Sequence, residues 1–188
     1  MNAAINPVAP AETAARKRGQ YLTFFLGTEV YAVEILRIRE IIEYGNGNIT
    51  EVPTMPEFIL GVVNLRGAVV PIVDLAARFG KKRCEPGRKT CILILEIETH
   101  AEKQYLGIVV DSVSTVVKIP SAEIVEPPSF GANIRPEFIS GMGKVNGKLA
   151  IILNVNSVLS VDEIATLAEA GDAQPAATAT VEVAANAA

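Results

Sequence analysis

The segment Pro56-Glu57-Phe58-Ile59-Leu60-Gly61 recurs 80 positions later as Pro136-Glu137-Phe138-Ile139-Ser140-Gly141, and this repeat is the main indication of the fold. The same offset places Gly67 on Gly147 and continues without a gap through the apolar run that follows. A constant offset of this kind predicts two copies of one β-rich unit in tandem. We therefore expect one body made of two similar halves, whose shared boundary is a natural docking surface for another protein.

A second, looser echo lies upstream of the first. Residues 31–35 resemble residues 106–110, and spaced aliphatic side chains follow each segment. If the halves pack face to face, these aliphatic side chains either line a docking groove at the boundary or belong to the core. They are Ile38 and Ile41 in the first copy and Val113 and Val116 in the second.

Composition and charge exclude several classes of protein. The chain has 188 residues, of which 49% are hydrophobic, so it can bury the core of one typical domain or of two small ones. Its net charge of −4 argues against nucleic-acid binding, which relies on clustered positive charge. No apolar run reaches the ~20 residues of a membrane span, and no secretory signal opens the chain. We therefore expect a cytoplasmic protein in which Cys84 and Cys91 are reduced thiols.

The chain divides into one body and two tails. Residues 1–19 are rich in Ala and polar residues, lack apolar periodicity, and are expected to be a disordered tail. The body is expected to span residues 20–165. Residues 166–188 are expected to hold the end of a C-terminal helix and a second disordered tail. That helix opens with the capping-box pattern Ser-Val-Asp-Glu of residues 160–163 and carries an apolar face.

Short strands and turns dominate the body. Asn146-Gly147 between apolar runs is a strong hairpin signal, because both residues tolerate positive φ, and the repeat predicts the same turn at Arg66-Gly67. Residues 90–97 are apolar on both faces and predict a central strand. Residues 74–79, followed by Gly80, predict a short helix. Strands of this number and spacing close most readily into small barrels, so the predicted fold class is mainly β.

Three further expectations concern the first copy and the segment after it. Residues 54–60 are expected to form a helical turn capped by Thr54. Pro71 lacks an N–H, so its strand is expected at an edge or beside a bulge. The basic run over residues 78–89 is either a solvated connector between the halves or a contact for an acidic partner or a membrane surface.

The sequence holds no cluster of reactive groups that points to catalysis. His100 is the only histidine and lies in a polar loop. Paired Cys/His spacing for a metal and a complete phosphate-binding glycine loop are both missing, so we expect neither a metal nor another cofactor. A small hydrolase or transferase that uses Glu40, Asp74 or His100 stays as an alternative. It would require inward acidic groups where the pattern places aliphatic ones.

Two features are harder to explain as core or as solvated surface. Residues 36–41 alternate aliphatic with charged side chains directly after a strand, which predicts an exposed charged rim beside Ile41. Arg66 stands where the second copy has Asn146. Arginine is less favourable than asparagine in a tight turn, and a residue that is unfavourable for its local structure is a candidate for function. Glu40 is its expected ionic partner, and the alternative interpretation is an ordinary surface ion pair.

Residues 64–75 carry a highly specific motif, Asn-Leu-Arg-Gly-Ala-Val-Val-Pro-Ile-Val-Asp-Leu. It is preceded by Pro56-x-Phe58-Ile59-x-Gly61-Val62 and followed by Gly107-Ile108-Val109-Val110-Asp111-x-Val113. Over residues 20–165 these motifs resemble the CheW-type chemotaxis coupling proteins. Because neither a response-regulator domain nor a kinase domain follows, the chain resembles the stand-alone form of the family.

The resemblance implies two intertwined SH3-like five-stranded β-barrels that enclose a hydrophobic groove. It also implies a non-enzymatic adaptor that binds the cytoplasmic tip of chemoreceptors and the regulatory domain of the chemotaxis histidine kinase. Other couplers in array rings are further implied partners. Such a protein is cytoplasmic and associates with the membrane only through the receptors. It binds no nucleic acid, metal or other cofactor. The same coupling role in a non-chemotactic array is an alternative.

The resemblance also implies partner-binding positions and no catalytic residue. The receptor-contacting aliphatic positions of the family fall on Leu22, Ile35, Ile38, Ile41, Val113 and Val116. The functionally sensitive polar and glycine positions fall on Glu40, Gly61, Arg66 and Gly67.

Overall fold

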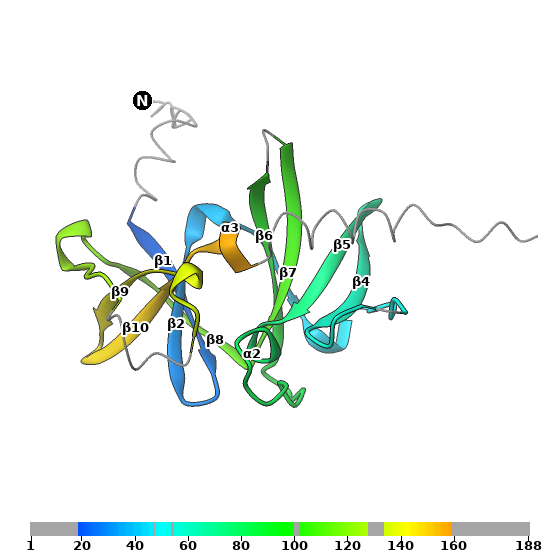
Figure 1. Ribbon diagram of the computed structural model, residues 1–188, viewed down its shortest axis with the longest axis horizontal. Helices are drawn as coiled ribbons and strands as arrows, with labels where there is room; N and C mark the ends of the chain where they lie inside the picture. Colours follow the sequence, from blue (N-terminus) through cyan, green and yellow to red (C-terminus); the bar gives the residue numbers. More distant parts are fainter. Residues whose placement is uncertain (1–18, 47, 54, 100–101, 128–133, 159–188) are drawn as a thin grey trace, which may run out of the picture.

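Two five-stranded sheets make up the body of the protein (Figure 1). The computed structural model describes residues 19–46, 48–53, 55–99, 102–127 and 134–158. Sheet A lies on the left in Figure 1 and sheet B on the right, with the long hairpin of β6 and β7 rising above the rest of the ribbon.

Each sheet mixes strands from distant parts of the chain. Sheet A has the order β8-β1-β2-β10-β9 and sheet B the order β3-β6-β7-β5-β4. The strands of sheet A are β1 (Gln20–Leu26), β2 (Glu29–Glu34), β8 (Ser112–Lys118), β9 (Ile139–Val145) and β10 (Lys148–Leu153). Those of sheet B are β3 (Ile38–Glu43), β4 (Ile59–Leu65), β5 (Ala68–Asp74), β6 (Cys91–Thr99) and β7 (Glu102–Val110). The mainly β fold class is confirmed, and β6 is an interior strand as predicted for residues 90–97.

The two repeat copies exchange strands. The first copy supplies β1 to β5 and the second supplies β6 to β10. Sheet A combines the β1–β2 hairpin of the first copy with three strands of the second, and sheet B combines the β6–β7 hairpin with three strands of the first. Two parallel pairings join the exchanged parts, with Ala32 beside Ile152 and Gly107 beside Ile72. The halves are therefore intertwined, because neither copy holds all the strands of one sheet.

Both copies contain the predicted tight turn. Between β4 and β5, Arg66 and Gly67 have φ angles of 54° and 91°. Between β9 and β10, Asn146 and Gly147 have φ angles of 50° and 78°. Two successive positive φ values are the signature of the two-residue hairpin turn. The prediction that Arg66-Gly67 forms the same turn as Asn146-Gly147 is confirmed.

A short helix follows the last strand of each copy. α2 (Leu75–Arg78) begins after Asp74, whose Oδ1 accepts a hydrogen bond from the Ala77 N–H at 3.0 Å. This confirms the helix predicted for residues 74–79. α3 (Val155–Val158) occupies the equivalent place in the second copy. The described residues also form the 3₁₀-helices η1 (Ile35–Arg37), η2 (Tyr44–Asn46), η3 (Ser121–Glu123) and η4 (Pro136–Phe138).

The described residues form three clusters of buried side chains. The largest takes residues from both sheets, among them Leu22 and Phe24 of sheet A and Leu95 of sheet B. We call the face of each sheet that contributes to this cluster its central face. Successive side chains alternate between faces, so Tyr21 of sheet A and Ile94 of sheet B belong instead to two smaller clusters, one for each sheet.

One local prediction in the first copy needs correction and another is met in one of its two forms. The helical turn expected over residues 54–60 is a turn at residues 57–58, and β4 begins at Ile59, whose N–H donates to the carbonyl of Pro56 at 2.9 Å. Pro71 lies in β5, which has β7 and β4 as neighbours and is not an edge strand, but the pairing of β5 with β4 contains a register shift between Ile59 and Gly61, next to Pro71. Pairing with β7 begins one residue later, at Ile72, so the missing N–H of Pro71 interrupts no ladder on that side.

Some predicted elements lie outside the described residues. These are Thr54, His100, the helix expected from Ser160 and the two tails of the chain.

Candidate partner-docking surface

Two pairs of predicted contact residues, Ile38/Ile41 and Val113/Val116, lie three positions apart within β3 and β8. In a regular strand, side chains three positions apart point to opposite faces of the sheet. A shared face therefore requires one extra residue between the members of each pair.

β8 contains this extra residue opposite Thr23 of β1. Val116 pairs with Leu22 and Val113 pairs with Phe24, so the pairing register shifts between these two points. Residues paired across antiparallel strands lie on the same face, and Leu22 and Phe24 both belong to the largest cluster. The bulge therefore places Val113 and Val116 together on the central face of sheet A.

β3 repeats this arrangement in sheet B. Ile38 pairs with Leu95 and Ile41 pairs with Leu93, and the register shifts between Ile38 and Glu40. Leu93 and Leu95 both belong to the largest cluster. Ile38 and Ile41 therefore share the central face of sheet B.

Residues 36–41, whose aliphatic and charged side chains predicted an exposed charged rim beside Ile41, do not form one regular strand. Residues 35–37 form η1, and the bulge after Ile38 breaks the alternation inside β3. Ile41 consequently lies on the same face as Ile38 instead of facing away from it. The sequence did carry a signal for the bulges, since aliphatic residues spaced by three within a strand-like segment occur in both copies.

Five partly exposed aliphatic side chains lie on the central faces or pack against the largest cluster. Ile41 and Val116 keep 45% and 47% of their surface exposed. Ile38 and Val113 are half-buried and pack against the cluster, as does Ile35 of η1. An aliphatic side chain left in water is stabilised when another protein covers it. We call Ile35, Ile38, Ile41, Val113 and Val116 the aliphatic rim.

Three other predicted positions have a visible structural role. Leu22 is only 4% exposed and supports Val116, its cross-strand partner. Gly61 has a φ of 141°, and a Cβ there would lie 2.1 Å from the carbonyl oxygen of Thr50. Gly67 completes the β4–β5 turn. Direct contact of these three residues with a partner stays a prediction.

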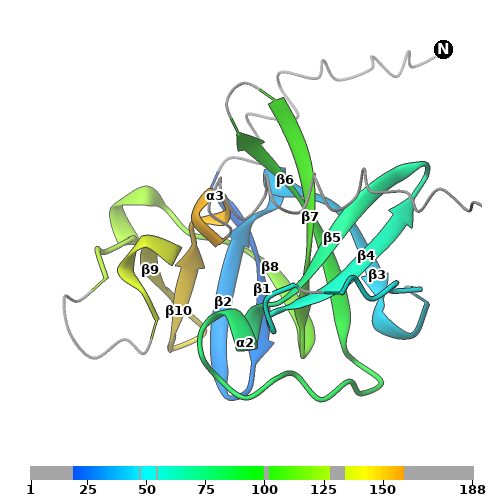
Figure 2. The ribbon, with the colours of Figure 1, turned by 45° about the vertical axis from the view of Figure 1, so that its right-hand side comes forward.

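An ion pair spans the two edges of sheet B. β3 and β4 are the first and last strands of the sheet, and Figure 2 shows β3 behind β4 on the right. Arg66 Nη2, in the turn after β4, lies 3.5 Å from Oε1 of Glu40 on β3, so the predicted pair forms. The two side chains are 78% and 34% exposed, so the pair contributes only ~0–1 kcal/mol to stability. The equivalent positions near sheet A hold the uncharged Thr115 and Asn146.

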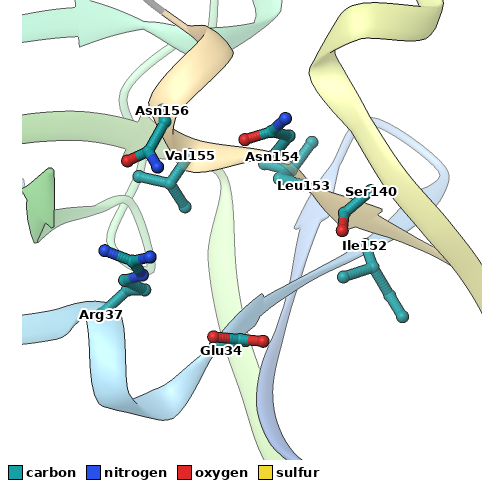
Figure 3. A pocket seen from close by; sticks show the side chains of 8 residues that line it. All are labelled: Glu34, Arg37, Ser140, Ile152, Leu153, Asn154, Val155 and Asn156. Atoms are coloured by element: carbon teal, nitrogen blue, oxygen red, sulfur yellow. The ribbon is translucent and has the colours of Figure 1, made fainter. Parts of the chain in front are cut away.

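Two hollows lie outside the aliphatic rim. One has a volume of about 110 Å³ and is lined by polar and aliphatic side chains, with Glu34, Arg37 and Asn156 among the polar ones (Figure 3). Nη1 of Arg37 in this hollow also lies 3.8 Å from Oε1 of Glu98. The other has a volume of about 470 Å³ and lies between the β1–β2 turn and the loop after α2.

The basic run over residues 78–89 crosses from α2 to β6 and contacts sheet A on its way. Lys81 pairs with the carboxylate of Glu29, and its Nζ lies 3.0 Å from the hydroxyl of Tyr31. Both partners belong to β2. These contacts favour the connector interpretation of the run, and binding of an acidic partner or a membrane there stays a prediction.

Cys84, in the same loop, lies in acidic surroundings. Its thiol donates to Oδ1 of Asp111 at 2.7 Å, and its N–H donates to Oδ2 of Asp74 at 3.1 Å. Burial and the two carboxylates raise the pKa of the thiol to about 12. Such a thiol stays protonated at neutral pH and is a poor nucleophile. Both Cys84 and Cys91 are free, as expected.

Neither a metal centre nor a membrane-spanning helix is found in the described part of the chain. Within it, no group of three or more His, Cys, Asp and Glu side chains could hold a metal ion, and no helix is long and apolar enough to cross a bilayer. Of the residues considered for a hydrolase, Glu40 is in an ion pair and Asp74 caps a helix.

Comparison with known proteins agrees with this architecture. A family model described as the CheW-like domain matches residues 20–163. The chain is 33% identical over 146 residues to the chemotaxis protein CheW of Klebsiella aerogenes, covering 78% of this chain and 84% of that protein. It is 33% identical over 143 residues to the chemotaxis protein CheW of Helicobacter pylori, covering 76% and 82%. The crystal structure of the scaffolding protein TtCheW from Thermoanaerobacter tengcongensis matches with a TM-score of 0.69 and 32% identity, covering 77% of this chain and 94% of that one.

Two intertwined five-stranded barrels that present an aliphatic rim define a module for contacts between proteins. The chain belongs to the CheW-like domain family. Its barrels are the SH3-like barrels of that family, and the protein is a scaffold and not an enzyme.

Proposed function

We propose that this chain is the adaptor that couples transmembrane chemoreceptors to the chemotaxis histidine kinase. The cytoplasmic tip of the receptor binds at the aliphatic rim, and the regulatory domain of the kinase binds on another face. The protein works in the cytoplasm and is recruited to membrane receptor arrays through the receptors.

One observation carries the proposal for the receptor site. Ile41 and Val116 are equivalent residues of the two copies. The bulges in β3 and β8 place each of them on the central face of its sheet, where they are exposed to nearly the same extent, 45% and 47%. A bulge interrupts the ladder of hydrogen bonds between strands, so its presence in both copies calls for a reason. Presentation of one more aliphatic side chain beside the central cluster supplies that reason.

An amphipathic helix is the kind of partner that fits this surface. Helices dock on apolar surfaces through anchor side chains on one face, and the tip of a receptor is a helical hairpin in this family. Fully burying one aliphatic side chain gives roughly 1.5–3 kcal/mol, and half-exposed ones give about half of that. The five side chains of the rim therefore support binding in the micromolar range once the cost of association is included.

Glu40 directly precedes Ile41 of the rim in β3, and because it pairs with Ile94 it meets Arg66 from the other face of sheet B. Charges beside an apolar contact set orientation and partner choice more than affinity. We therefore expect the pair to fix the register of the receptor helix. Many such weak contacts, together with contacts to other couplers, then hold an array by multivalency.

The test is binding of a soluble receptor fragment, the cytoplasmic helical hairpin, to the purified protein by calorimetry. Ile41→Asp and Val116→Asp place a charge at the two exposed positions and should each weaken binding at least tenfold, because a desolvated unpaired charge opposes docking. Leu149→Asp is the matched control, since Leu149 is 56% exposed and lies outside the rim. It should bind the receptor fragment like the wild-type protein.

The outcomes separate the alternatives. Unchanged binding by both rim variants, with unchanged melting temperatures, would remove the receptor site from the rim. An equal loss with Leu149→Asp would show a nonspecific effect of charge. Retention of receptor fragment and kinase together on the immobilised wild-type protein tests the coupling role itself.

A further inference from the structure

Thr23 is a buried polar residue on β1, with 1% of its surface exposed. Its hydroxyl donates a hydrogen bond to the carbonyl oxygen of Thr115 at 2.7 Å. Oγ1 of Thr23 also accepts a hydrogen bond from the Thr115 N–H at 3.2 Å. One side chain of β1 therefore binds both backbone groups of one residue on β8.

Thr115 lies inside the β8 bulge, between Val113 and Val116. In the pairing of β1 with β8, neither Ser114 nor Thr115 has a partner residue, and Thr23 stands opposite them. A bulged residue is left unpaired by the ladder. The Thr23 hydroxyl replaces the backbone hydrogen bonds between strands that Thr115 lacks.

Sheet B shows no matching contact among its described residues. The β3 bulge faces Ile94 and Leu95, which carry no hydrogen-bonding side chain. Glu40, the residue after the bulge, pairs with Arg66 on the face of sheet B that carries Ile94. In the described part of the chain, a buried hydroxyl therefore binds the bulge in β8 and not the one in β3.

We propose that Thr23 is a positioning residue for receptor binding. Its hydroxyl holds the β8 bulge and thereby keeps Val116 on the central face beside Val113. This inference rests on the proposed function of the rim. Thr23 itself is too buried to touch a partner, so it acts only through Val116.

The physical reason is the two-residue period of a strand. If the extra residue in β8 were absorbed by a shift of register, every side chain beyond it would move to the other face of the sheet. Val116 would then pair with Tyr21 and leave the rim, and the polar Thr115 would take its place opposite Leu22. Satisfying both backbone groups of Thr115 opposes this shift.

The experiment compares Thr23→Val, which keeps the shape and removes the hydroxyl, with Thr23→Ser, which keeps the hydroxyl. Binding of the receptor hairpin fragment should weaken about fivefold to tenfold in Thr23→Val, the factor expected from one ordinary hydrogen bond or slightly more. Thr23→Ser should bind within about twofold of wild type. In Thr23→Val, the Thr115 amide should exchange its hydrogen faster, and the NMR contact between the methyl groups of Val116 and Leu22 should weaken.

A double-mutant cycle separates positioning from general stability. If Thr23 acts through Val116, adding Thr23→Val to Val116→Ala should cost less binding than Thr23→Val costs alone. Additive losses would overturn the proposal. So would wild-type binding by Thr23→Val. If Thr23→Val does not fold, Thr23→Cys offers a side chain of similar size that bonds weakly, and the same outcomes apply.

Failure of the proposed function gives a different pattern. If the wild-type protein binds no receptor fragment, the proposed function and the binding role of Thr23 fall together. If the wild-type protein binds and Thr23→Val binds equally well, only the positioning role falls.

Discussion

Arg78 of α2 donates its Nε–H to the carbonyl oxygen of Val158 of α3 at 2.7 Å, and these two residues are equivalent under the repeat offset of 80. The guanidinium carbon also lies 4.5 Å from the ring centre of Phe58 and 5.1 Å from that of Phe138, which are themselves equivalent. Equivalent residues that meet in this way lie close to the approximate twofold axis that relates the copies. Arg78 therefore links the two halves where they approach each other.

Replacement of Arg78 should destabilise the whole fold. Arg78→Ala removes the hydrogen bond to Val158 and the contacts of the cation with the rings of Phe58 and Phe138, so we expect a loss of at least about 2–3 kcal/mol in the free energy of unfolding. Arg78→Lys keeps the charge but not the planar group, and should lose about half as much. Urea unfolding of the two variants measures this, and an Arg78→Ala protein as stable as wild type would contradict the linking role.

The hairpin exchange depends on a glycine in sheet B. A Cβ at Gly107 would lie 2.3 Å from Cδ1 of Ile72, its neighbour across the parallel pairing. We expect Gly107→Ala to lose about 1–3 kcal/mol of stability through overpacking. Ile72→Val removes the clashing atom, so the double variant should recover much of the loss. Stability equal to wild type in Gly107→Ala alone would show that the β6–β7 hairpin has room to move.

Separated halves should assemble because each sheet needs both copies. A break between Pro86 and Gly87, which lie in the exposed connector, leaves β1 to β5 on one fragment and β6 to β10 on the other. Fragments 1–86 and 87–188, produced together, should purify as a one-to-one complex with the circular dichroism spectrum of the intact protein. A single fragment that folds alone as a monomer would contradict the exchange of strands.

The acidic surroundings of Cys84 should make its thiol slow to react. With Cys91 replaced by Ala, the rate of reaction with a disulfide reagent at pH 8 should be far below that of an exposed cysteine, because burial and Asp111 raise the thiol pKa to about 12. Asp111→Asn removes a nearby negative charge, lowers the thiol pKa and should speed the reaction. Equal rates in the two proteins would show that burial alone controls the thiol.

The same shift predicts a loss of stability at alkaline pH. Because the folded protein holds the thiol proton more tightly than the unfolded chain, Cys84 contributes its full stabilisation below its ordinary pKa of 9.0 and loses it as the pH rises toward 12. Urea unfolding between pH 8 and pH 11 should show a smaller decline for Cys84→Ser than for the wild-type protein.

Much of the local structure follows from the sequence. The repeat located both copies of the hairpin β4–β5 and β9–β10, and Asn146-Gly147 predicted the turn that Arg66 also adopts. The aliphatic pairs in β3 and β8 and the Glu40–Arg66 pair were predicted as well, in part through resemblance to a family. These features depend on neighbours in the chain or on a pattern repeated at a constant offset.

The bulges and the hydroxyl that holds one of them were not predicted. The spacing of Val113 and Val116 does not show which face of the sheet they share, because that depends on the strand paired with β8. Thr23 lies 92 positions from Thr115, and nothing near it in the chain marks it as a partner.

Two similar sets of short strands with defined turns can be predicted from the amino-acid sequence, because hydrophobic period and positive φ angles are properties of a few adjacent residues. Which hairpin completes which sheet, and which side chains reach the aliphatic rim, depends on long-range packing. The parallel pairings Ala32–Ile152 and Gly107–Ile72 join residues far apart in the chain, and a strand alone is compatible with several partners and registers. Only packing around the shared central cluster selects among them.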